Sequence, residues 1–88
     1  MSYNCSLAIQ SDTETLEILE KGLSSLREAQ IEISCGELEA DFREDTSGVV
    51  SDLAEKYNLS FTMDFYDEDN IHYFSKYING TEVDSEVL

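Results

Sequence analysis

The chain has 88 residues with 20 acidic and five basic side chains, which gives a formal net charge of -15 at pH 7. Its hydrophobic fraction of 41%, with five tyrosines and four phenylalanines, is too high for a disordered acidic tail. Five dispersed basic residues exclude a phosphate-binding basic patch and direct binding to an anionic membrane. We therefore expect one folded acidic domain over residues 1–84 and a frayed C-terminus at 85–88.

The first third of the chain predicts a strand followed by a helix. Apolar and polar residues alternate over 3–10, as in a strand with one buried face. Ser11 can cap the next helix, and Glu14 can reach back to complete a capping box. Leucines recur at helical spacing over 16–26, so the helix is expected at about 12–28.

The next segment predicts a β-hairpin. Apolar residues occupy the odd positions over 31–35 and the even positions over 38–42, and Gly36 and Glu37 lie between the two segments. A type II′ turn at these two residues explains the change of parity and brings both apolar sets to one face. A single strand with a bulge at Gly36 is the alternative, and the hairpin is favoured.

A second helix follows the hairpin. Thr46 or Ser47 can cap its first turn, and apolar residues between 49 and 57 form one stripe. Asn58 can end this helix in a left-handed conformation. The two helices are therefore expected to cover the same apolar sheet face.

The last third predicts further strands. An alternating strand at 61–65 leads through an acidic loop at 67–70 to another strand at 71–78. The Asn-Gly pair at 79–80 is a strong type I′ turn signal, so the chain is expected to fold back through 81–83.

The order β-α-β-β-α-β predicts an α+β, ferredoxin-like fold: an antiparallel sheet with two helices on one face and one or two extra C-terminal strands. In the strand order 4-1-3-2, another strand separates those that carry Cys5 and Cys35. Two strand spacings of about 4.8 Å exceed the ~7 Å limit for a disulfide. Both cysteines are therefore expected to be free thiols.

The strongest candidate site is the acidic side of the hairpin. Glu32, Glu39 and Asp41 lie opposite the apolar face, and the expected register sets Glu32 across from Asp41, which costs stability. Alternate residues on a strand lie about 6.8 Å apart, a spacing comparable to a sugar–phosphate backbone. Such a row suits either a surface that imitates DNA or a solvated face that confers solubility. The candidate partner-binding residues are acidic and lie on the predicted hairpins and the acidic loop: Glu32, Glu37, Glu39, Asp41, Asp64, Asp67, Glu68 and Asp69.

Motifs of catalysis and metal binding are not visible in the sequence. The acidic loop at 67–69 does not have the spacing of an EF-hand. His72 is the only histidine and lacks a Ser/His/Asp or Cys/His context. We therefore expect no enzyme activity, no cofactor and no metal.

Residues 53–69, continuing to 77–80, look similar to small YubB-like proteins of phages and plasmids. The shared features are a helix that ends in a tyrosine, an alternating strand, an acidic loop, another strand and an Asn-Gly turn. Asn4-Cys5-Ser6 also resembles that family's Asn-Trp-Cys-Ser-Asn opening, although this chain has no tryptophan. The resemblance implies a ferredoxin-like fold and a mobile-element origin, and it supplies no catalytic residues.

These observations predict a non-enzymatic binding protein that occupies a basic nucleic-acid-binding surface of a host defence protein. Its charge resembles that of DNA-mimic inhibitors of the anti-CRISPR or anti-restriction type. The alternative is a small structural or dimerisation module, a homodimer paired through its C-terminal strands, whose acidity only confers solubility. The first residues do not form a signal peptide, so a cytoplasmic location, in the host cell if phage-encoded, is expected.

Overall fold

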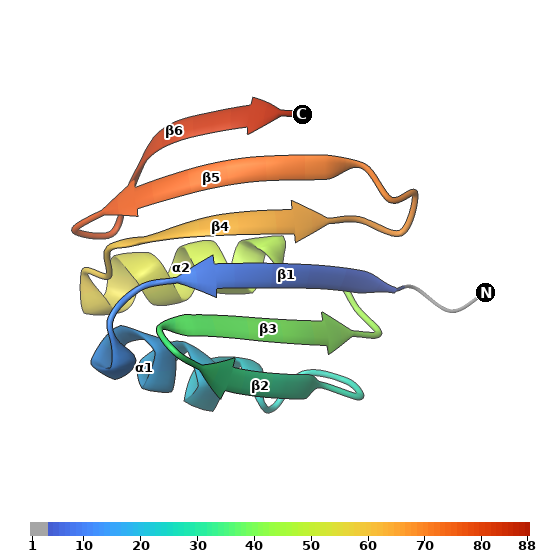
Figure 1. Ribbon diagram of the computed structural model, residues 1–88, viewed down its shortest axis with the longest axis horizontal. Helices are drawn as coiled ribbons and strands as arrows, with labels where there is room; N and C mark the ends of the chain where they lie inside the picture. Colours follow the sequence, from blue (N-terminus) through green and yellow to red (C-terminus); the bar gives the residue numbers. More distant parts are fainter. Residues whose placement is uncertain (1–3) are drawn as a thin grey trace.

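Alternating apolar and polar residues build six strands, and two amphipathic helices lie between them in the chain. The computed structural model describes residues 4–88, apart from the side chain of Ser47, so the expected contribution of Tyr3 to the first strand lies outside the described residues. The strands are β1 (Cys5–Gln10), β2 (Gln30–Ser34), β3 (Glu37–Phe42), β4 (Phe61–Tyr66), β5 (His72–Ile78) and β6 (Thr81–Val87), and the helices are α1 (Thr13–Leu23) and α2 (Ser47–Tyr57). The strands form one sheet in the order β2-β3-β1-β4-β5-β6, and all neighbours are antiparallel (Figure 1).

Both helices cover the same face of the sheet, where the core lies (Figure 1). Helix α1 buries three leucines, and α2 buries Val50 and Ala54. The sheet contributes alternate residues of its strands to this core: Cys5, Leu7, Ile9, Leu38, Ala40, Phe42, Phe61, Met63, Phe65 and Tyr77. The prediction of an α+β fold with an antiparallel sheet and two helices is confirmed.

The first hairpin turns one residue earlier than expected. Cys35 and Gly36 form its turn with φ angles of 49° and 78°, as a type I′ turn requires. Ser34 then pairs with Glu37, and Glu32 faces Glu39 rather than the expected Asp41. The shift leaves the apolar residues of both strands on the covered face and adds Glu37 to the ladder, while Cys35 becomes exposed.

Helix α1 is capped by Asp12 rather than by the expected Ser11. The Asp12 Oδ1 atom accepts a hydrogen bond from the Thr15 N–H at 2.8 Å. Interactions with the Thr15 side chain and then with its backbone N–H hold the pKa of the Asp12 carboxyl below its ordinary value. The Ser11 hydroxyl instead donates to the Ser60 carbonyl at 2.7 Å, which joins the end of β1 to the start of β4. The helix ends at Leu23, earlier than the expected residue 28.

Helix α2 ends as expected and begins differently. Asn58 adopts the left-handed conformation with φ 54° and ends the helix. Thr46 occupies the N-cap position, but within the described chain its side chain does not bond the first turn. Thr46 is instead fully buried, with its hydroxyl 3.7 Å from the Cys5 sulfur.

The C-terminal segment is more ordered than expected. Asn79 and Gly80 have φ angles of 50° and 84°, so the predicted type I′ turn is confirmed. The return strand does not stop at residue 83 or fray at 85–88: β6 runs to Val87, which pairs with Tyr73. Its length follows from β5, which offers a hydrogen-bonding partner along the whole segment.

Both cysteines are free thiols, as predicted. Cys5 is buried on β1, which β3 separates from β2, and its Sγ donates to the Glu44 carbonyl at 3.1 Å. Burial raises the pKa of this thiol, which disfavours the reactive thiolate form. Across residues 4–88, neither helix has the length and apolar character needed to cross a membrane.

Candidate acidic interface

The side of the sheet away from the helices carries most of the predicted contact residues. We call this side the open face. Successive side chains on a strand point to opposite faces, so the strand pairings define its members. Within residues 4–88 it carries seven carboxylates and one lysine: Glu32, Glu37, Glu39, Asp41, Asp64, Asp84 and Glu86, with Lys76.

Strand register arranges the open face in rows across the sheet. The central row takes one residue from each strand, in the order Glu32, Glu39, Ala8, Asp64, Phe74 and Glu86. Five spacings of about 4.8 Å give this row a length of about 24 Å. Four of its six positions are acidic, so negative charge extends across the entire sheet.

The β2–β3 hairpin holds the densest group of carboxylates. Glu32 and Glu39 are directly opposite each other, with Glu37 and Asp41 two residues to either side of Glu39 on β3. The pKa of the Glu39 carboxyl is raised by a hydrogen bond with Glu37 and then by the negative charges of Glu37, Glu32 and Asp41. Mutual repulsion is thus built into this surface.

We expect Glu39→Gln to stabilise the protein at neutral pH. Because the folded-state pKa of Glu39 is raised, its favourable contribution is complete below the ordinary pKa near 4.5 and is lost as the pH rises through the raised value. The variant should therefore melt about 1–3 °C higher than wild type at pH 7. Thermal unfolding followed by circular dichroism at pH 4 and pH 7 measures this difference.

The advantage of Glu39→Gln should shrink at pH 4, where wild-type Glu39 is largely protonated. Glu17→Gln removes one charge from the exposed side of α1 and serves as the control. An equal rise in melting temperature for the two variants, or a rise for Glu39→Gln that does not depend on pH, would contradict a local origin of the repulsion.

Hydrogen bonds fix two other acids of the open face. The Ser6 hydroxyl donates to the Asp41 Oδ1 at 2.7 Å. His72 Nε2 lies 2.8 Å from the Asp64 Oδ1, and the His72 ring stacks on Tyr66 with their centroids 4.4 Å apart. These contacts orient the Asp41 and Asp64 carboxylates on the open face.

A shallow hollow of about 230 Å³ lies in the middle of the open face. It forms where Ala8 places a small side chain between larger neighbours on β3 and β4. Glu39 and Asp41 line one side of it, and Tyr66 lines the other. The hollow combines negative charge with an aromatic ring, and these groups suit a basic side chain.

The predicted acidic loop does not join the open face as a unit. Asp67 is engaged in the loop: its Oδ1 accepts from the N–H groups of Asp69 and Ile71 at 2.9 and 3.0 Å. Its Oδ2 accepts from the Tyr73 hydroxyl at 3.2 Å. Tyr73 faces the helix-bearing side, so Asp67 belongs to the opposite surface, whereas Glu68 and Asp69 are exposed at the loop tip.

Two acids of the open face were not among the predicted contacts. Asp84 and Glu86 lie on β6, opposite Lys76 and Phe74 of β5. The Asn79-Gly80 turn was the sequence signal for these two acids, because a hairpin turn implies a return strand, and a strand of ordinary length would include Asp84 and Glu86. Counting that strand as only three residues long left both acids out.

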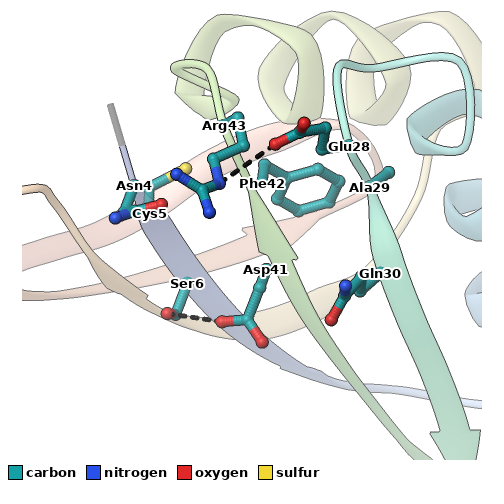
Figure 2. Close-up of a pocket in the computed structure, with 9 residues that line it drawn as sticks. All are labelled: Asn4, Cys5, Ser6, Glu28, Ala29, Gln30, Asp41, Phe42 and Arg43. Atoms are coloured by element: carbon teal, nitrogen blue, oxygen red, sulfur yellow. Dashed lines mark hydrogen bonds and ion pairs between the residues drawn. The ribbon is translucent and has the colours of Figure 1, made fainter. Parts of the chain in front are cut away.

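A larger hollow of about 620 Å³ lies at the edge where β1 begins and β3 ends (Figure 2). Arg43 and Glu28 form an ion pair across it, with Nε and Oε2 3.1 Å apart. Figure 2 also shows the Ser6–Asp41 hydrogen bond on the other side of the Phe42 ring. The ion pair balances the charges of Arg43 and Glu28, and the Asp41 carboxylate of the open face also lines this hollow.

Among the described residues, histidine, cysteine and carboxylate side chains do not form a group of three or more that could hold a metal ion. Comparisons of the chain with protein-family models, curated proteins and solved structures gave no match.

Proposed function

We propose that this chain is a non-enzymatic binding protein whose open face occupies a basic, nucleic-acid-binding surface of a partner protein. One observation carries the proposal: seven carboxylates and one lysine share a solvent-exposed sheet face, counted over residues 4–88. Like charges that face each other across strands, as those of Glu32 and Glu39 do, lower the stability of the fold, and this cost supports a role for the charges at the surface.

The arrangement of the charges suits a partner that normally holds nucleic acid. Carboxylates recur along β3 about every 6.8 Å and across the sheet for about 24 Å, so the surface presents spaced negative charges as a phosphate backbone does. Long-range attraction would accelerate association with a basic groove and would weaken as salt increases. The hollow at Ala8 offers a central seat for one lysine or arginine of the partner.

The class of protein is part of the same proposal. The strands β2-β3-β1-β4 with α1 and α2 are consistent with a ferredoxin-like unit, to which β5 and β6 add two strands. This arrangement agrees with the resemblance to YubB-like proteins of phages and plasmids. An inhibitor of a host defence protein, of the anti-CRISPR or anti-restriction type, would account both for a mobile-element origin and for the negative charge.

Charge reversal on the open face tests the proposal. The immobilised protein is exposed to nuclease-treated lysate of the host cell at low salt and then eluted with duplex DNA. The wild-type protein should capture DNA-binding proteins, which then appear in the DNA eluate. The variant Glu32/Glu39/Asp41→Lys should capture about a tenth of that amount or less.

The matched control reverses the same number of charges on the helices. Glu17, Asp52 and Glu55 are exposed on α1 and α2, and Glu17/Asp52/Glu55→Lys should retain nearly as much as wild type. Equal losses for both triple variants would assign the capture to net charge alone. Capture that duplex DNA does not displace would overturn nucleic-acid mimicry.

A dimerisation module is the second candidate, favoured by the exposure of every residue of the edge strand β6. Antiparallel pairing of two copies centred on Asp84 would place Glu82 opposite Glu86, so like charges would face each other. A dimer of this kind should strengthen with salt, whereas capture of a basic partner should weaken. Sedimentation of the wild-type protein at about 50 mM and about 500 mM salt separates the two functions.

A further inference from the structure

The sheet is wider than the helical layer that covers it. The two helices pack on the apolar face, but the described part of the chain has no third helix after β5 or β6 to cover these two strands. A cleft of about 490 Å³ results on the helix-bearing side, between the start of α2 and strands β4 to β6. It lies on the face opposite the acidic interface and plays no part in the proposed function.

The floor of the cleft is apolar and aromatic. Met63, Phe65 and Tyr77 are buried there, and the half-buried Tyr73 lies beside Phe65 with ring centroids 6.1 Å apart. The rings are tilted by 46°, so a flat group entering the cleft meets both an aromatic face and an aromatic edge.

The rim of the cleft is acidic. Asp45, Asp67 and Glu82 line it, and among its described lining residues there is no lysine or arginine. Asp67 is held in place by the hydrogen bond from the Tyr73 hydroxyl, which also raises the pKa of that phenol. Glu82 is exposed and interacts with the Tyr77 hydroxyl, so both carboxylates lie at the edges of the aromatic floor.

We propose that this cleft binds an arginine side chain of a partner protein. A guanidinium group is planar, stacks on aromatic rings and donates paired hydrogen bonds to carboxylates, while its alkyl stem packs on apolar surface. A second copy of this chain is a poor donor because two chains of net charge -15 repel each other. A lysine lacks the planar fork, so it should bind more weakly.

The probe is the blocked tripeptide Ac-Gly-Arg-Gly-NH2, added to isotopically labelled protein and followed by amide NMR shifts. The matched peptide with citrulline has nearly the same shape without the charge. The arginine peptide should bind with a Kd of roughly 1–10 mM and shift the amides of Gly48, Tyr73 and Ser75. Citrulline should bind at least about tenfold more weakly.

Two variants locate the site. A Cβ at Gly48 meets no atom within 4 Å, so Gly48→Leu should fold and fill the mouth of the cleft, abolishing the shifts. Glu82→Gln should weaken binding about fivefold. Glu86→Gln removes the same charge from the open face of the same strand and should weaken it less than about twofold.

Three results would overturn the inference: equal binding of the citrulline peptide, shifts centred on the open face, or unchanged binding by folded Gly48→Leu. None of them bears on capture through Glu32, Glu39 and Asp41, because those residues lie on the other side of the sheet. Conversely, the open-face triple variant should retain the shifts at Gly48, Tyr73 and Ser75.

Discussion

Gly80→Ala is expected to lower the free energy of unfolding by about 3 kcal/mol. Gly80 has a φ of 84°, and an added Cβ would lie 2.7 Å from the Ala54 carbonyl oxygen and 3.1 Å from the Glu55 Cα. Neither backbone atom can yield in the way a side chain can. The close approach exists because the Gly80 N–H donates to the Leu59 carbonyl at 2.8 Å, which ties the β5–β6 turn to the end of α2.

Urea unfolding of Gly80→Ala and of a second variant, Gly48→Ala, measures this effect. Gly48→Ala is the control, since its Cβ meets open space and alanine favours the helix; it should stabilise by up to about 0.5–1 kcal/mol. A loss below about 1 kcal/mol for Gly80→Ala would show that the turn can move off α2 at little cost.

Phe42→Ala is expected to cost about 3–4 kcal/mol, a large part of the stability of a domain of this size. The Phe42 ring is 2% exposed and belongs to the core cluster, where it lies beside Cys5 of the neighbouring strand. Truncation would leave a void at the end of the core, next to the hollow of Figure 2. The thermal midpoint should fall by roughly 15–20 °C.

Phe74→Ala is the matched control because it removes the same ring from the open face, where the side chain is only half-buried. That change should cost about 1 kcal/mol. Phe42→Leu should recover more than half of the loss, because it restores most of the buried volume. Similar losses for the two alanine variants would mean that the open face contributes to the core as much as the covered face does.

The sequence predicted the elements whose local chemistry allows one conformation. Asn79-Gly80 and Asn58 both adopt the left-handed geometry that these residue types favour. Where neighbouring residues could perform the same task, the prediction failed. Ser11 and Asp12 can both cap α1, and only the tertiary contact between Ser11 and Ser60 decides which one does.

The first hairpin shows the same limit. Gly36 is the obvious turn residue, but a type I′ turn also requires its neighbour to adopt a positive φ, and Cys35 does so at 49°. A cysteine rarely adopts that conformation, so its residue type gave no warning. The turn also accepts a hydrogen bond from a distant part of the chain, from the Ser11 N–H to the Gly36 carbonyl at 3.2 Å, and local sequence does not reveal this contact.

The candidate site was predicted where strand alternation decides the face and missed where long-range pairing does. Glu32, Glu39 and Asp41 follow directly from the apolar pattern of their own hairpin. Asp67 looked like a surface acid because sequence proximity to Glu68 and Asp69 cannot reveal its hydrogen bond to Tyr73. The helix-side cleft depends on a mismatch between the widths of two layers, which no single segment encodes.

The irregularity in β6 has a consequence for insertions and deletions. Tyr77 pairs with Glu82 and Lys76 pairs with Asp84, so Val83 is the extra residue of a bulge. Loss of Val83 would leave every other pairing intact, with Glu82 beside the cleft and Asp84 on the open face. Loss of Ser85 would instead turn Glu86 to the helix-bearing side. Two deletions of one residue, only two positions apart, would therefore have opposite outcomes for the surface that this strand displays.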